Sequence, residues 1–75
     1  MRTQTEKRVR WIALDSKVIV VAVEGEVKDW AAYIGAVNGN NHFEEYPYVM
    51  NRGTKLPQRV AEILFPEFKC LRWRD

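Results

Sequence analysis

The stretch VIVVAV, residues 18–23, constrains the fold of this 75-residue chain more than any other feature. All six positions are apolar and nearly all are β-branched. A strand with one solvated face alternates apolar and polar residues, so this run indicates a strand that is covered on both faces. A membrane-spanning helix needs about 20 apolar residues, and the run is far shorter. We therefore expect a central strand here.

The residues before this run predict its hairpin partner. Residues 7–14 alternate, with Arg8 and Arg10 on one face and Trp11 among the apolar residues of the other. This period of two is typical of a half-buried strand. Residues 15–17, Asp-Ser-Lys, suit a short turn. The two strands should pair, with the second one inside the sheet.

The next segment favours a helix over residues 29–37. Asp29 suits an N-cap, and WAAYIGAV follows it with apolar residues at helical spacing and two consecutive alanines. Asn38 and Gly39 would form the C-cap. The same Asn-Gly pair also suits a hairpin turn. The alanines and the Asp cap favour the helix.

Two further helices are predicted after this segment. Asn41 and Glu44 have the spacing of a capping box, so a helix should begin at His42, and Pro47 should kink or shorten it. A last helix is expected over residues 54–65, capped by Thr54 and stopped by Pro66.

The tail FKCLRWR, residues 68–74, should return as a strand. Leu71 and Trp73 would point inward, and Arg72 and Arg74 outward. We predict a small single α+β domain over residues 7–75, in the order β-β-α-α-α-β. It would have an antiparallel sheet of about three strands with its helices on one face. Residues 1–6 are polar and are predicted to be a flexible N-terminus.

This layout leaves one face of the central strand partly uncovered. A chain this short buries a modest share of its surface, and small domains are often stabilised by oligomerisation. We therefore expect a homodimer.

Arginines occur in both terminal strands and define the first candidate surface. Arg8, Arg10, Arg72 and Arg74 would share one sheet face if these strands were neighbours, and such a strip can hold phosphates. The tryptophans alternate with the arginines and point to the opposite face, where they cannot stack on bases. A solvated strand face is favoured, and weak nucleic-acid binding is the alternative.

Three tyrosines define the second candidate surface. Tyr33, Tyr46 and Tyr48 would suit a protein interface, because tyrosine buries well and keeps a polar tip. The alternative is a second core layer under the sheet.

Catalytic and metal chemistry find little support in the sequence. His42 is the only histidine, whereas zinc sites take three or four protein ligands. Cys70 has no oxyanion motif near it, and a buried structural cysteine is the favoured interpretation. The glycines lack the spacing of a phosphate loop. We predict no enzyme, no metal and no cofactor.

The compartment follows from the N-terminus and the single thiol. MRTQTEKR does not have the form of a signal peptide, and a lone cysteine suits a reducing compartment. We expect a cytoplasmic protein that does not bind membranes.

The pairs Asp29-Trp30 and Lys55-Leu56, and the triplet at residues 64–66, resemble short uncharacterised bacterial proteins of phages and other mobile elements. The resemblance implies a small accessory protein that acts by binding, and it carries no activity over. The functional hypothesis is therefore a non-catalytic protein that binds a protein partner. The alternative is a nucleic-acid-binding accessory or regulatory protein that uses the arginine face.

Overall fold

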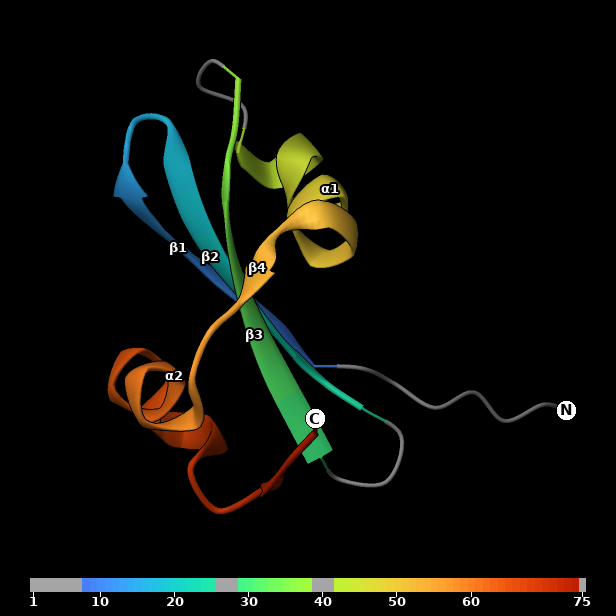
Figure 1. The fold of residues 1–75 in the computed structure, drawn as a ribbon, viewed down its shortest axis with the longest axis vertical. Coiled ribbons are helices and arrows are strands. Elements are labelled where there is room, and N and C mark those ends of the chain that lie inside the picture. Colours follow the sequence, from blue (N-terminus) through green and yellow to red (C-terminus); the bar gives the residue numbers. More distant parts are fainter. Residues whose placement is uncertain (1–7, 26–28, 39–41, 75) are drawn as a thin grey trace, which may run out of the picture.

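The computed structural model describes residues 8–25, 29–38 and 42–74. The fold is α+β, as predicted, and its sheet and helices follow one another along the chain as shown in Figure 1. The elements are β1 (Val9–Asp15), β2 (Val18–Glu24), β3 (Asp29–Ala36), α1 (His42–Arg52), β4 (Thr54–Lys55), α2 (Gln58–Leu64), the 3-10 helix η1 (Pro66–Phe68) and β5 (Arg72–Trp73).

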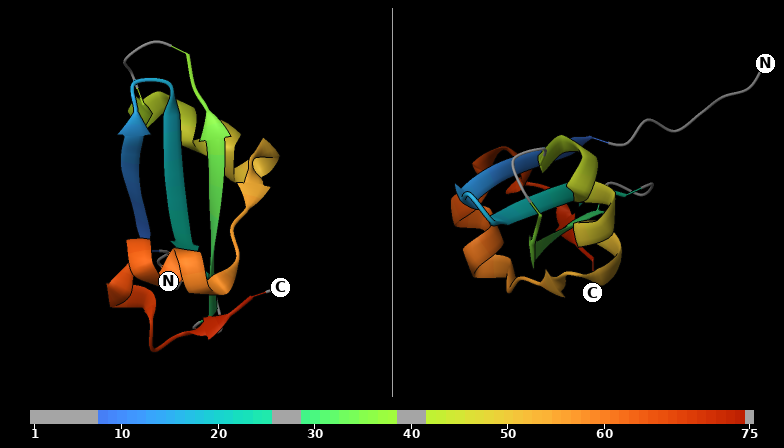
Figure 2. Two further views of the ribbon diagram at one scale, coloured as in Figure 1. Left: turned by 60° about the vertical axis from the view of Figure 1, so that its left-hand side comes forward. Right: turned by 90° about the horizontal axis from the view of Figure 1, so that it is seen from above.

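The first three strands form an antiparallel meander with β2 in the centre. Residues at the middle of the strands lie side by side: Trp11 is opposite Val21, and Val21 is opposite Tyr33. The short strand β4 pairs antiparallel with β3, and β5 pairs parallel with it. The left view of Figure 2 shows β1, β2 and β3 side by side. The predicted inner strand is confirmed.

The predicted helix over residues 29–37 is wrong, because Asp29–Ala36 is strand β3. The strand pairs with β2 along its whole length, from Trp30 opposite Glu24 to Ala36 opposite Val18. Burial on both faces removes the alternation that marks a half-buried strand. Alanine favours helices by a few tenths of a kcal/mol per residue. That local preference is smaller than the gain from pairing and burying an eight-residue strand.

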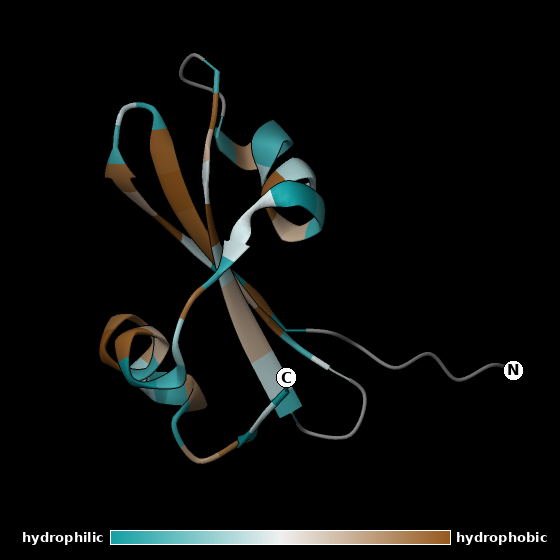
Figure 3. Ribbon diagram, viewed as in Figure 1, coloured by the Kyte–Doolittle hydropathy of each residue, from teal (hydrophilic) through white to brown (hydrophobic). Residues whose placement is uncertain are grey.

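Each face of β2 lies against its own helix, so the prediction of helices on one face is also wrong. Figures 1 and 2 show α1 on one side of the sheet and α2 on the other. The apolar colouring of Figure 3 runs along β2 and onto the helices on both sides. The α1-side core comprises Ile19, Val21, Val37 and Val49. The α2-side core comprises Val20, Ala22, Trp30, Ala32, Ala61, Phe65 and Phe68.

The predicted helix over residues 54–65 begins later than expected. Thr54 and Lys55 form β4, and α2 starts at Gln58. Pro57 explains the delay, because the residue before a proline is sterically restricted to extended backbone. That residue, Leu56, donates its backbone N–H to the carbonyl of Ala32 at 2.9 Å and so continues the attachment to β3.

The tail forms a shorter strand than predicted. Phe68 belongs to η1 and is fully buried, and only Arg72 and Trp73 make strand β5. Over residues 72–74 the predicted alternation is confirmed: Trp73 packs against the α2-side core, and Arg72 and Arg74 are exposed.

Helix α1 begins at His42, as predicted, and continues past Pro47 to Arg52. The predicted cap at Asn41, the Gly39 turn and the flexible N-terminus lie outside the described residues. Among the described helices, none has both the length and the apolar character that a membrane crossing requires.

Candidate protein-interaction edge

Strand β1 is the open edge of the sheet, because among the described strands it pairs only with β2. The backbone N–H of Glu24 donates to the carbonyl of Arg8 at 2.9 Å. Successive residues of an antiparallel strand direct their backbone groups to alternate sides. The N–H and C=O groups of Arg8, Arg10 and Ile12 therefore face β2. The N–H and C=O groups of Val9, Trp11 and Ala13 point the other way, in the plane of the sheet and away from β2.

At the opposite edge of the meander, the backbone of β3 is hydrogen-bonded to later segments of the chain. On β3, the carbonyl of Trp30 accepts from the N–H of Arg74 at 2.8 Å, and the carbonyl of Ala32 accepts from Leu56 at 2.9 Å. The next outward residue, Ile34, lies opposite Thr54 in β4. The meander therefore presents its unbonded backbone on the β1 side.

Aromatic side chains lie beside the open edge. Trp11 packs against the α1-side core, and its ring meets that of His42 edge-on, with centroids 5.8 Å apart. Phe43 follows His42 in α1, contacts Tyr46 at 5.7 Å between centroids, and is 65% exposed. Figure 2 shows that α1 crosses its face of the sheet from the β1 side to the β3 side, so its first turn lies near the edge.

We call this region the β1 edge surface. It comprises the outward backbone groups of Val9, Trp11 and Ala13, with the side chains of Trp11, His42 and Phe43. A bulge limits it at one end: Ala13 is opposite Ile19 and Asp15 is opposite Val18, so Leu14 is the extra residue. Bulges interrupt regular pairing. The regular part of the edge therefore ends at Ala13.

Arg8, just before β1, and Arg10, within it, each have an acidic partner. The Nε atom of Arg8 lies 2.8 Å from a carboxylate oxygen of Glu24, and the guanidinium stands over the Phe68 ring, 4.7 Å from its centroid. Arg10 forms an ion pair with Glu67 of η1. Both guanidinium groups are therefore compensated within the chain.

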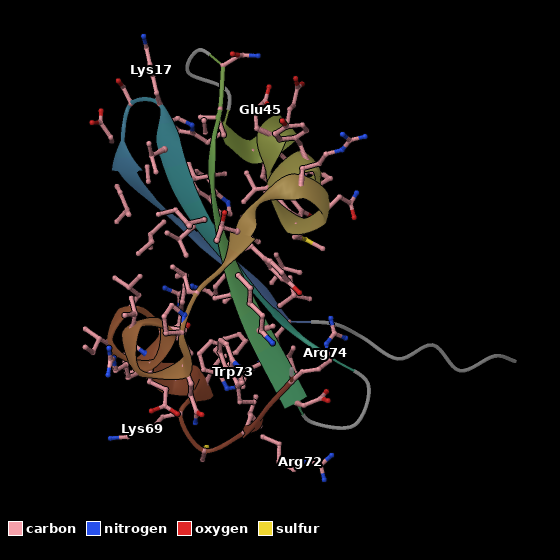
Figure 4. All side chains as sticks on the ribbon, in the orientation of Figure 1. Lys17, Glu45, Lys69, Arg72, Trp73 and Arg74 are labelled. Atoms are coloured by element: carbon pink, nitrogen blue, oxygen red, sulfur yellow. The ribbon has the colours of Figure 1, made fainter. Side chains whose placement is uncertain are left out.

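Arg72 in β5 and Arg74 just after it lie elsewhere, because the terminal strands are not neighbours and that premise is wrong. Strand β1 pairs with β2, and β5 pairs with β3, which leaves two strands between them. In Figure 4 Arg72 points away from the body of the molecule while Trp73 points into it. The four arginines do not sit on adjacent strands, because the tail returns to the far edge of the meander.

The three candidate tyrosines divide between core and surface. Tyr33 of β3 and Tyr46 of α1 both pack against the α1-side core. Tyr48 is 54% exposed on α1. Tyr33 and Tyr46 therefore both belong to a core layer under the sheet, the alternative weighed for them, and Tyr48 lies at the surface.

The remaining candidate residues are His42 and Cys70. His42 lies against Trp11, and the described residues hold no cluster of three or more His, Cys, Asp or Glu side chains. The prediction of a buried Cys70 is wrong, because its side chain is exposed. It follows η1 in a turn rather than standing in the predicted strand, and the turn carries it away from the core.

Sequence reasoning missed the β1 edge surface itself. The alternation of Val9, Trp11 and Ala13 was visible, but an edge strand and an inner strand of a half-buried sheet share that pattern. Phe43 was the one further signal, because it is a large apolar residue between His42 and Glu44 in an otherwise polar first turn.

Comparison with known proteins gives no match: no family model fits the chain, and neither the curated proteins nor the solved structures include a similar one.

Proposed function

We propose that this chain is a small, non-catalytic interaction protein that recognises a protein partner through the β1 edge surface. The observation that carries the proposal is the open strand with Phe43 exposed beside it. Unbonded backbone groups give an extended segment a row of hydrogen-bonding partners, and neighbouring side chains supply specificity. Large aromatic residues are enriched where proteins bind one another.

The surroundings of the edge favour a protein over a small polar ligand. Trp11, His42 and Phe43 offer aromatic area, and the basic groups beside the edge strand, on Arg8 and Arg10, are already compensated within the chain. A partner that adds a strand would satisfy the outward groups of Val9, Trp11 and Ala13 and shield the half-buried Trp11 ring.

Photo-crosslinking tests the proposal with a control from the same molecule. The photoreactive residue p-benzoylphenylalanine replaces Phe43 in one variant and Ile63 in the other, where Ile63 is 77% exposed on α2 across the sheet. Crosslinked proteins are identified by mass spectrometry from cells that produce each variant. We expect defined adducts from position 43 and few from position 63. Equal adducts from both positions, or none from position 43, would contradict the proposal.

Nucleic-acid binding is the second candidate, supported by the exposed Arg72 in β5 and Arg74 just after it. Phosphate contacts need basic groups that act together. Arg8 and Arg10 are engaged with Glu24 and Glu67 on the other side of the meander. That separation favours the protein-binding function.

The proposal includes a cytoplasmic location, an accessory role and a homodimer. The single cysteine supports the reducing compartment. Helices α1 and α2 cover both faces of β2, so an uncovered face no longer supports self-association. The support now comes from the edge of the sheet.

A further inference from the structure

We propose that the partner of the β1 edge surface is a second copy of this chain, with the two β1 strands antiparallel across a two-fold axis at Trp11. The inference rests on the proposed function, since it uses the same surface and names its occupant. It commits to one register, in which Trp11 is opposite Trp11 of the second copy and Val9 is opposite its Ala13.

The backbone of β1 is complementary to itself in this register. Two antiparallel strands bond through residues whose groups face one another. Val9, Trp11 and Ala13 all face outward, and they are spaced evenly about Trp11, so each meets an outward residue of the second copy. The bulge at Leu14 lies just beyond the last bonded pair. Every regular outward residue of β1 then has a partner.

The charges of β1 disfavour one of the two neighbouring registers. With Trp11 on the axis, Arg10 is opposite Ile12 of the second copy, so no arginine faces an arginine. Sliding one strand by two residues, so that Val9 meets Trp11, would place Arg10 opposite Arg10. Like charges directly opposite each other destabilise a strand pair. In the chosen register Arg10 also keeps its own Glu67.

The aromatic residues beside the edge fit the same arrangement. Trp11 lies on the α1 face, where it is only partly covered by His42. A two-fold axis at Trp11 puts both copies of α1 on one face of the joined sheet, with their first turns toward each other. The two Trp11 rings would then lie between the two Phe43 side chains, each 65% exposed in the single chain.

Ala13→Pro tests the pairing while sparing the fold. The N–H of Ala13 faces away from β2, so proline removes no bond inside the chain, and proline is tolerated where an edge N–H faces solvent. Ala13 is also exposed. The matched control is Ala13→Thr, which changes the side chain, favours strands and retains the N–H. Amide hydrogen exchange at Val21 in β2 verifies that each variant is folded.

Sedimentation equilibrium at micromolar concentration gives the readout. We expect the parent chain and Ala13→Thr to sediment at twice 8.8 kDa. For Ala13→Pro we expect a rise of at least about 100-fold in the dissociation constant, which is a loss of about 2.7 kcal/mol. A mixture of differently isotope-labelled copies should show contacts between Val9 of one copy and Ala13 of the other.

Two results would overturn the inference. One is a parent chain that remains at 8.8 kDa. The other is a dimer that Ala13→Pro leaves intact. The crosslinking experiment separates these failures from failure of the proposed function. A monomer whose position 43 captures other proteins supports a foreign partner at this surface, whereas a monomer without such adducts removes both proposals.

Discussion

The rings of Trp30 and Trp73 meet edge-on, with centroids 4.8 Å apart and planes at 86°. Trp30 is fully buried in β3, and the Phe68 ring lies 4.9 Å from it. The Nζ atom of Lys55 lies 5.1 Å from the centre of the Trp73 ring. This contact holds residues 72–74 against the sheet. Strand β5 itself contributes only two residues to the pairing with β3.

We expect Trp73→Ala to lower the free energy of unfolding by about 2–3 kcal/mol, because it removes a partly buried aromatic ring from the α2-side core. Urea unfolding measures the loss, and the emission of Trp30 should shift to longer wavelength as water reaches it. Arg72→Ala is the control on the same strand and should stay within about 0.5 kcal/mol. Equal effects of the two substitutions would show that Trp73 does not anchor the tail.

Gly53 and Gly35 should tolerate alanine very differently. A Cβ atom at Gly53 would lie 2.5 Å from the carbonyl oxygen of Val49 and 2.7 Å from that of Ile34, so the backbone must move. At Gly35 it would meet the methyl groups of Val49 at 3.2 Å, and a side chain can give way. We expect Gly53→Ala to cost about 1–3 kcal/mol, as overpacking does, and Gly35→Ala to cost less. Thermal unfolding of both variants provides the comparison, and the reverse order would contradict the close approach at Gly53.

The ion pair of Arg10 with Glu67 should add little stability. Both side chains are partly exposed, at 53% and 31%, so solvent screens the pair. A double-mutant cycle with Arg10→Ala and Glu67→Ala should give a coupling of less than about 1 kcal/mol, and less still at high salt. A larger, salt-insensitive coupling would mean that the pair organises η1 against β1.

Specific nucleic-acid binding should be absent at physiological salt. Arg72 and Arg74 lie on the far side of the meander from Arg8 and Arg10, so few phosphates can be neutralised together. Fluorescence anisotropy with labelled single- and double-stranded oligonucleotides should show only loose association that weakens as salt rises. Submicromolar affinity at about 0.15 M salt, lost in an Arg72→Ala, Arg74→Ala double variant, would support the nucleic-acid function instead.

Cys70 should react in the native state. Its side chain is exposed after η1, and it is the only cysteine of the chain. A chromogenic disulfide reagent should therefore titrate the thiol without denaturant, at a rate close to that in urea. A Cys70→Ser variant sets the baseline. Strong protection of the native thiol would mean that a partner, or a second copy, covers the turn.

The elements that local patterns determine were predictable. The alternation around Arg10 and the apolar run from Val18 marked β1 and β2, and α1 begins at His42, where the spacing of Asn41 and Glu44 placed it. Each of these signals lies within a few residues of the element it predicts. No partner elsewhere in the chain is needed to interpret it.

The other elements, strands β3, β4 and β5, depend on contacts between residues that are distant in the sequence. The alanines of β3 favour a helix locally, but pairing with β2 and burial between two layers outweigh that preference. The attachment of both β4 and β5 to β3 was equally hidden, because two-residue strands leave no periodic pattern. The position of β5 in turn decided that Arg72 and Arg74 lie away from β1.

The two short strands that share one side of β3 also limit how many molecules can join edge to edge. Strand β4 pairs with Tyr33 and Ile34, and β5 pairs with Asp29 and Trp30. This side of β3 therefore has no unpaired run long enough to bind a strand of another chain. If β1 joins β1, one neighbour occupies the only long open edge among the described strands. The product is a closed pair rather than a fibre, and raising the concentration should fill that pair without lengthening it.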